Sequence, residues 1–190
     1  MKTLKINALS ILMNLAFLGI LLPACSQSNK KSNNTSTIDK PDMDLHTAVL
    51  YNNLEAVRQH IEAGTDINAK EPFGGSTPLI TAVTFDKKEI AKTLVDAGAD
   101  LTATNNDGST ALHSAAFFCR VEMVQMLIDA NADKTVRNNY GATPRETIMG
   151  PFAEIKPVYE MMQKQLEPMG LKLDMEQLEK TRPVVSMMLQ

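Results

Sequence analysis

The segment GSTPL at residues 75–79 recurs as GSTAL at 108–112 and as GATPR at 141–145, at a spacing of 33 residues. A second set has nearly the same period: AGTD at 63–66, AGAD at 97–100 and ANAD at 130–133. A fixed period of this length is the sequence signature of a stacked-repeat protein. The two sets divide the chain into units at about 42–72, 73–105, 106–138 and 139–150 onward.

Each unit contains the residues of two helices joined by a turn. Thr77 and Thr110 are typical N-caps for the first helix, and Pro78 suits its first position because the N–H that proline lacks has no partner there. The second helix is predicted to begin at the equivalent positions Asn52, Asp86 and Cys119. It is predicted to end at Gly64, Gly98 and Asn131, whose types tolerate a left-handed backbone.

These residues resemble the ankyrin repeat, whose signature is Thr-Pro-Leu-His-x-Ala-Ala in the first helix and Gly-Ala-Asp after the second. The resemblance covers about residues 42–150. It implies an all-α solenoid of about four helix-turn-helix repeats with short extended finger loops and a helical C-terminal cap. The motif departs at both ends, where Leu45 lacks a preceding Thr-Pro and Arg145 replaces the motif leucine. Such departures are expected of terminal repeats, which face water on one side.

Residues 151–190 lose the repeat register and are predicted to form the cap and a tail. One helical face is traced by Ile155, Val158, Tyr159, Met162 and Leu166, and we interpret it as the outer helix of the cap. Asp174 is predicted to cap a short helix that ends before Arg182-Pro183. The last 42 residues hold seven of the 12 methionines, which is typical of either an adaptable packing or partner-binding surface or a loosely ordered extension.

The N-terminus has the pattern of a targeting signal. Lys2 and Lys5 precede an apolar run over residues 6–22, and LPAC at 22–25 resembles the lipobox of bacterial lipoproteins. The resemblance implies removal of residues 1–24 and lipidation of Cys25, and Ser26 after it favours sorting to the outer membrane. Residues 25–41 are too polar to form a core and are predicted to be a flexible tether.

Two other interpretations of this N-terminal segment rank lower. An uncleaved membrane anchor is disfavoured because the apolar run is short for a span and contains Asn7, Ser10 and Asn14. Ordinary signal cleavage after Ala24 would require a small residue where Leu22 stands.

Composition and motifs exclude several classes of protein. Two cysteines can form neither a disulfide-dense scaffold nor a four-thiolate zinc site. Residues 42–150 carry 15 Asp and Glu against 9 Lys and Arg, which argues against binding to nucleic acid or anionic lipid. The sequence also lacks a helical His pair, Cys-x-x-Cys, a phosphate-binding glycine loop and Gly-x-Ser-x-Gly. We therefore expect no enzyme activity, no metal and no cofactor.

The three histidines are interpreted as structural residues. His46 and His113 occupy the motif histidine, which in the ankyrin family ties neighbouring repeats together. His60 stands where Leu94 and Leu127 stand in later units and is predicted to be a partly buried packing residue.

Cys119 is the one reactive-residue candidate. A thiol at the N-terminus of a helix would have a lowered pKa and would be prone to oxidation outside the cytoplasm. The alternative is that Cys119 is a small, half-buried and inert residue.

Aromatic side chains are the candidates for partner binding, since aromatic anchors are common at interfaces. Six of the nine aromatics lie near the ends of the predicted first helices or on the predicted finger tips: Tyr51, Phe85, Phe117, Phe118, Phe73 and Tyr140. Tyr51, Phe85 and Phe118 repeat with the period, so for them packing between units is an equally good explanation.

The sequence therefore predicts a monomeric, non-enzymatic module in the bacterial cell envelope. It would be held by its lipid, face the periplasm from the outer membrane, and bind or regulate a protein partner. The alternative is a periplasmic redox or oxidative-stress accessory protein that uses Cys119. A secreted effector conflicts with the lipobox unless Cys25 is not processed.

Overall fold

The computed structural model describes residues 41–190. The predicted signal segment, Cys25 and all but the last residue of the predicted tether lie outside this range. Eight α-helices and two short 3-10 turns follow one another along the described chain: α1 (Leu45–Leu50), α2 (Leu54–Glu62), α3 (Pro78–Thr84), α4 (Lys88–Asp96), α5 (Ala111–Phe117), α6 (Val121–Asp129), η1 (Glu146–Ile148), α7 (Phe152–Leu166), η2 (Glu167–Met169) and α8 (Met175–Met188). Among these helices, none is both long and apolar enough to cross a membrane.

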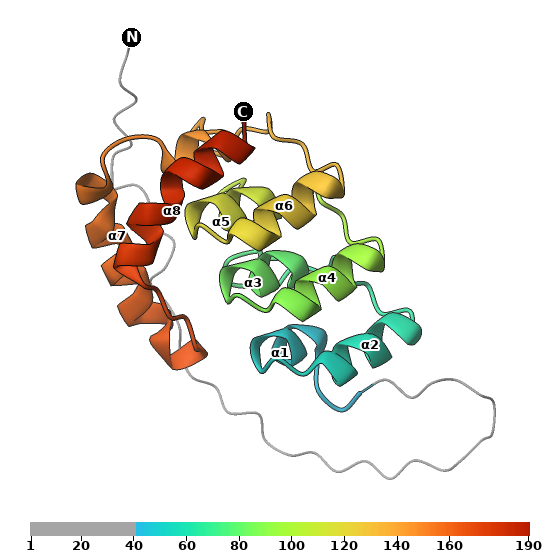
Figure 1. The fold of residues 1–190 in the computed structure, drawn as a ribbon. Coiled ribbons are helices and arrows are strands. Elements are labelled where there is room, and N and C mark those ends of the chain that lie inside the picture. Colours follow the sequence, from blue (N-terminus) through green and yellow to red (C-terminus); the bar gives the residue numbers. More distant parts are fainter. Residues whose placement is uncertain (1–40) are drawn as a thin grey trace, which may run out of the picture.

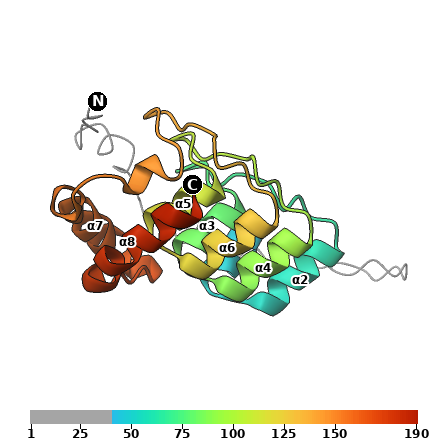
Figure 2. The same cartoon turned by 45° about the horizontal axis from the view of Figure 1, so that its top comes forward.

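Three antiparallel helix pairs stack in sequence order (Figure 1). The first helices α1, α3 and α5 contact one another in one layer, and the second helices α2, α4 and α6 form the other. The connecting loops lie side by side along one edge of the stack (Figure 2). The prediction of an all-α repeat solenoid with extended finger loops is confirmed over three complete pairs, and the fourth unit is incomplete.

The first helices begin where the sequence predicts. The hydroxyl of Thr77 accepts from the N–H of Ile80 (3.3 Å), and that of Thr110 accepts from the N–H of His113 (3.4 Å). In the first unit, where Thr-Pro is missing, Asp44 takes over the capping role by accepting from the N–H of Thr47 (3.0 Å). The capping chemistry is therefore kept although the motif is not.

The predicted starts of the second helices are wrong by one residue. Asn52, Asp86 and Cys119 have left-handed backbones, with φ of 58°, 57° and 51°, and so they end the first helices. The N-caps are the next residues, Asn53, Lys87 and Arg120. Asn and Asp are favoured both at N-caps and in the left-handed region. The turn between the two antiparallel helices needs a left-handed residue at this position, so the N-cap is the residue after it.

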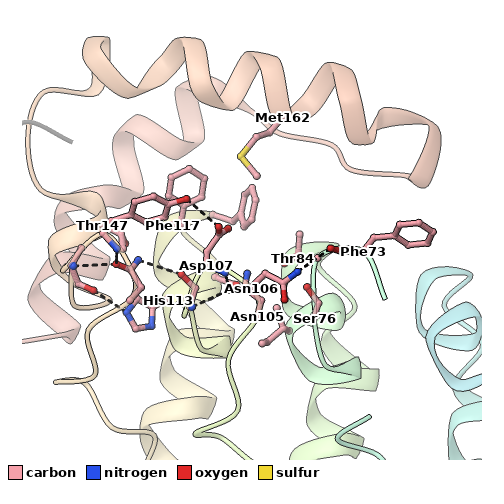
Figure 3. A pocket seen from close by; sticks show the side chains of 18 of the residues that line it. Phe73, Ser76, Thr84, Asn105, Asn106, Asp107, His113, Phe117, Thr147 and Met162 are labelled. Carbon is pink, nitrogen blue, oxygen red and sulfur yellow. Dashed lines mark hydrogen bonds between the residues drawn. The ribbon is translucent and has the colours of Figure 1, made fainter. Parts of the chain in front are cut away.

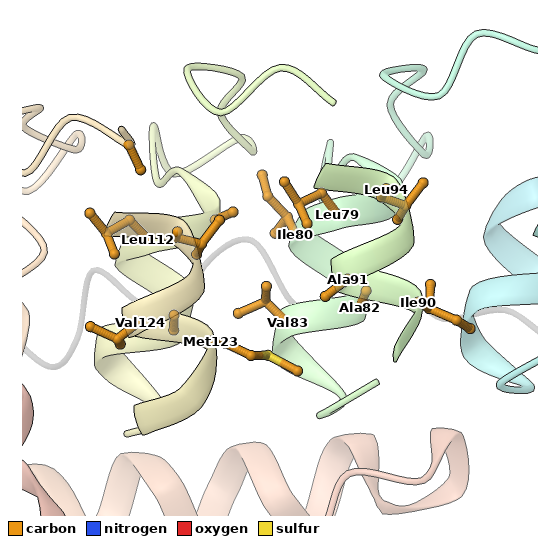
Figure 4. Packing of buried hydrophobic residues seen from close by; sticks show 14 of the residues in the cluster. Leu79, Ile80, Ala82, Val83, Ile90, Ala91, Leu94, Leu112, Met123 and Val124 are labelled. Carbon is orange, nitrogen blue, oxygen red and sulfur yellow. The ribbon is translucent and has the colours of Figure 1, made fainter. Parts of the chain in front are cut away.

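The core lies between the two helix layers and continues from one pair to the next (Figure 4). Leu94 and Leu127 are fully buried at equivalent places in α4 and α6, and Val83 and Ala115 are fully buried in α3 and α5. Burying one leucine contributes about 1.5–3 kcal/mol. Because a single pair has no partner for its apolar faces, the free energy of folding comes from stacking.

The finger loops are joined by a ladder of asparagines. The N–H of Asn106 donates to the carbonyl of Gly74 (2.8 Å), and its side-chain amide donates to the carbonyl of Phe73 (3.0 Å). Asn139 repeats this side-chain bond one unit later, to the carbonyl of Asn106 (2.9 Å). The ladder fixes the spacing of the finger tips and hence the shape of the edge they form.

Gly108 is expected to be more sensitive to substitution than Gly141, its equivalent one unit later. Both have positive φ, 70° and 74°, but a Cβ on Gly108 would lie 2.6 Å from Oδ1 of Asn139, whereas one on Gly141 meets nothing within 4 Å. Gly141→Ala should therefore cost only the backbone strain, about 1 kcal/mol, and Gly108→Ala at least 1 kcal/mol more. Urea unfolding measures both. Equal losses would contradict a close contact between fingers.

The fourth unit does not form a helix pair. Its first helix is reduced to the 3-10 turn η1, which packs on α5, and α8 rather than α7 packs on α6. The prediction that residues 155–166 form the outer helix of the cap is therefore wrong, although they are helical. α7 instead runs along the ends of the first helices, and α8 returns to close the stack (Figure 1).

α8 begins as predicted but does not end where predicted. Asp174 caps it by accepting from the N–H of Gln177 (3.0 Å), and the helix continues through Pro183 to Met188. Buried Val185 and Leu189 lie beyond the proline and hold the second half of the segment on the array. The methionine-rich tail is thus part of the packed cap, with Met175 and Met188 against the main core.

Candidate functional site

The C-terminal segment covers the ends of α3 and α5. Phe85 and Phe118, each at the end of a first helix, form a second buried cluster with Leu171, which follows η2. Met162 and Leu166 of α7 pack against this cluster. The face of α7 that the sequence predicts is therefore the one turned toward the array.

The C-terminal segment buries two of the three periodic aromatics and leaves the third exposed. Phe85 and Phe118 are 9% and 4% exposed, whereas Tyr51, their equivalent in the first unit, is 76% exposed. Of the two explanations open for these positions, packing holds for Phe85 and Phe118. The packing, however, is against the C-terminal segment as well as between units.

Phe117 is partly buried at the edge of this cluster. Its ring stands edge-on to Phe118 with centroids 5.1 Å apart, and its centroid is 4.7 Å from that of Tyr159 in α7. The hydroxyl of Tyr159 donates to the carbonyl of Phe117 (2.6 Å). These contacts leave Phe117 as the boundary between the packed cap and the open face beside it.

That open face contains a pocket of about 240 Å³. The finger tips, the first helices, η1 and α7 line it. The residues from the fingers are Phe73, Asn106, Asp107 and Tyr140, those from the first helices are Ile80, Thr84, His113 and Phe117, and those from η1 and α7 are Thr147, Ile155 and Met162. Figure 3 shows the finger residues on one side and Met162 of α7 opposite them. Of the candidate aromatics, Phe73, Phe117, Phe118 and Tyr140 line this pocket, and Tyr51 and Phe85 do not.

Phe73 and Tyr140, the two aromatic side chains from the fingers that line the pocket, differ in exposure and in hydrogen bonding. Phe73 is 62% exposed, and the hydroxyl of Tyr140 donates to Asp107 (3.0 Å) in the neighbouring finger. Burial, followed by the charge of Asp107 and this hydrogen bond, raises the pKa of Tyr140 to about 12. The phenol therefore stays protonated and Tyr140 has a fixed position, while Phe73 is free to contact another molecule.

The prediction that the motif histidines tie neighbouring repeats together holds for His113, while His46 bonds within its own unit. His46 bonds through Nε2 to the carbonyl of Ala69 (2.9 Å), and Nε2 of His113 donates to the carbonyl of Ala142 (3.1 Å), each in the following loop. His60 is fully rather than partly buried, and its Nε2 lies 2.7 Å from the carbonyl oxygen of Met43. Within residues 41–190, no group of three His, Cys, Asp or Glu is placed to hold a metal ion.

The burial of His113 predicts a loss of stability in mild acid. Burial lowers its pKa below the ordinary value of 6.5, so the unfolded chain binds a proton at a higher pH than the folded chain does. The free energy of unfolding should therefore fall as the pH drops from 7 through 6.5 toward 5. Urea unfolding across this range should give a steeper decline for the parent than for His113→Gln. Parallel slopes would contradict the assignment.

Cys119 does not have the properties of an activated thiol. It ends α5 instead of capping α6, it is 8% exposed, and burial raises its pKa. The predicted lowering of its pKa is wrong, because the left-handed residue precedes the helix N-terminus by one position and its side chain packs into the core. The observed surroundings match the inert alternative.

A buried arginine network holds the cap together, and sequence reasoning did not identify it. Arg182 of α8 is 6% exposed and donates to the carbonyls of Ile148 (2.7 Å) and Gly150 (3.3 Å) and to the hydroxyl of Tyr159 (3.3 Å). The available signal was its spacing, since Arg182 lies at helical intervals between Leu178 and Val185, which are both buried.

The comparison with known families agrees with this geometry. The family description "Ankyrin repeats (3 copies)" matches residues 45–138, which span the three complete helix pairs. Residues 45–138 are ankyrin repeats. The solved structure of the ankyrin repeat domain of Bcl-3, a member of the IkappaB family, is similar, with a TM-score of 0.53 and 34% identity over 54% of this chain and 45% of that one.

Curated relatives match a shorter part of this ankyrin-repeat protein. Protein phosphatase 1 regulatory subunit 27 is 44% identical over 64 residues in Homo sapiens and 42% identical over 64 residues in Mus musculus. In each case the match covers 34% of this chain and 41% of the relative. The ankyrin repeats and these relatives support a module that interacts with another protein, which is the coarse form of the predicted function.

Proposed function

We propose that this chain is a lipid-anchored ankyrin-repeat protein of the bacterial cell envelope that binds or regulates a protein partner. The partner would dock at the pocket between the finger tips, the first helices and α7. The observation that carries the proposal is Phe73, a large apolar side chain that is 62% exposed at the mouth of an aromatic-lined pocket. An exposed aromatic beside a pocket is the arrangement that interface hot spots use.

The C-terminal segment covers part of the first-helix layer and so excludes that part as a docking surface. Because Phe85 and Phe118 are covered by Leu171 and α7, a partner meets the array through the fingers and the uncovered part of the first helices. The relative that carries the name of a phosphatase regulatory subunit supports a role that works by binding another protein.

The membrane attachment rests on the sequence alone. The lipobox-like LPAC at residues 22–25 and the polar segment after it suit a lipidated Cys25 followed by a tether, with the array facing the periplasm from the outer membrane. Cys25→Ser should release the protein from the membrane fraction. Mass spectrometry of the mature N-terminus should find a lipidated Cys25, and an unmodified terminus elsewhere would refute the anchor.

Affinity capture from envelope membranes tests the docking site. Phe73→Ser is expected to reduce capture of the partner by about tenfold or more, as for an interface hot spot. Tyr51→Ser is the matched control, because Tyr51 is an aromatic residue of greater exposure that does not line the pocket. Equal capture by both variants, or selective loss with Tyr51→Ser, would move the docking site elsewhere on the array.

A further inference from the structure

We propose that the pocket receives an arginine side chain of the partner, with Asp107 as the counter-charge. This inference rests on the proposed function and names the chemistry of the partner. It starts from the charges that line the pocket. Asp107 is the one carboxylate among the lining residues, and no Lys or Arg is among them. The remaining titratable group near neutral pH, His113, is kept uncharged because burial lowers its pKa.

Asp107 lacks a cationic partner in the described part of the chain. Among residues 41–190, the only hydrogen bond to its carboxylate comes from the hydroxyl of Tyr140, a neutral group. No ion pair of Asp107 is found among residues 41–190, whereas Arg137 pairs with Glu146 (2.7 Å) and Arg120 pairs with Asp86 (3.4 Å). A half-buried carboxylate in a largely apolar pocket favours an incoming cation, because its charge is only partly screened by water.

The turn does not need the carboxylate of Asp107. Asp100 and Asp133 accept hydrogen bonds from the N–H groups of Thr102 and Thr135, so their carboxylates shape their own loops. In the loop that contains Asp107, the side chain of Asn105 holds the turn, because it accepts from the N–H groups of Asp107 (3.0 Å) and Ser109 (2.9 Å). The equivalent tip positions in the neighbouring units are Gly74 and Tyr140, so the repeat itself does not require an acid there.

The aromatic frame favours arginine over lysine. Phe117 and Tyr140 line the same pocket as Asp107, and the hydroxyl of Tyr140 bonds to the Asp107 carboxylate. A planar guanidinium stacks on aromatic faces and donates two parallel hydrogen bonds to a carboxylate, whereas an ammonium is a strongly hydrated point charge. Ile155 and Met162 on the α7 side would cover the apolar stem of the arginine.

A displayed library of random short peptides, selected on the purified array with its C-terminal helices, tests the inference. Arginine should be enriched at one position of the selected peptides. Asp107→Asn should weaken binding of these peptides by about tenfold or more, the usual effect of losing a hydrogen bond to a charged group. This variant keeps an oxygen that can accept from Tyr140, and a thermal melt checks that it folds. Glu89→Gln, on the second-helix layer, is the matched control and should bind like the parent.

Replacing the selected arginine by citrulline, which has the same shape without the charge, completes the test. Citrulline should weaken binding to the parent but make little difference to Asp107→Asn. Peptides without arginine, binding that is indifferent to Asp107→Asn, or no selected binder at all would overturn the inference. If capture from membranes depends on Phe73 but not on Asp107, the docking site stands and the arginine assignment fails; if it depends on neither, the proposed function fails as well.

Discussion

Phe118→Ala is expected to lower the free energy of unfolding by about 3–5 kcal/mol, the usual cost of truncating a buried aromatic. Phe118 is 4% exposed and packs against Phe85, Phe117 and the C-terminal segment. Truncating its side chain therefore leaves a cavity between α5 and that segment. Urea unfolding followed by circular dichroism measures the loss.

Phe73→Ala is the matched control for this loss. The same truncation at a side chain that is 62% exposed should change the free energy of unfolding by less than about 0.5 kcal/mol. Similar losses at the two positions would mean that the C-terminal segment does not cover α5. Comparing the two variants therefore distinguishes an aromatic side chain that packs in the core from one that is exposed. The repeat period alone does not make this distinction.

Arg182→Met is expected to cost about 3 kcal/mol. Methionine keeps much of the apolar stem but leaves the carbonyl of Ile148 and the hydroxyl of Tyr159 without their donor in a buried place. Since these bonds join α8 to the end of the fourth unit, the last repeat should unfold before the others. Hydrogen exchange should show early loss of protection in α6 and α8.

Two variants control this prediction. Lys180→Met likewise replaces a cationic side chain by methionine, but at an exposed position of α8, and should cost less than about 0.5 kcal/mol. Tyr159→Phe removes one partner of the network and should cost about 1 kcal/mol. An Arg182→Met variant as stable as Lys180→Met would show that the cap is held by its apolar contacts alone.

The repeat architecture could be predicted because each unit carries its own signals. The caps Thr77 and Thr110, the left-handed Gly64, Gly98 and Asn131, and the apolar periodicity depend on neighbours within one unit. Stacking then follows from the period itself. The starts of the second helices were misplaced because Asn and Asp suit two adjacent positions of the turn equally well.

The C-terminal cap could not be predicted to the same degree. The apolar face of α7 is visible in the sequence, but nothing local tells whether it packs on α6 or on the ends of α3 and α5. α8 takes the place on α6, and the buried contacts of Arg182 and Val185 on either side of Pro183 keep it helical. Such long-range contacts depend on shape and not on period.

The candidate site was predicted in part. Phe73, Phe117, Phe118 and Tyr140 come together at the pocket, but the burial of Phe85 and Phe118 follows from a segment more than 40 residues further along the chain. Asp107 was overlooked because acidic residues at turns are common. Its difference from Asp100 and Asp133 appears only in the hydrogen bonds.

Photo-crosslinking in the living cell tests the central claim most directly. A benzophenone amino acid would replace Phe73 at the pocket or, as the control, Lys92, which is 62% exposed on α4 away from it. The account predicts a protein adduct from position 73 and none of the same mass from position 92, and Asp107→Asn should weaken the adduct. Adducts of equal yield from both positions, or from position 92 alone, would contradict a partner that docks at the pocket.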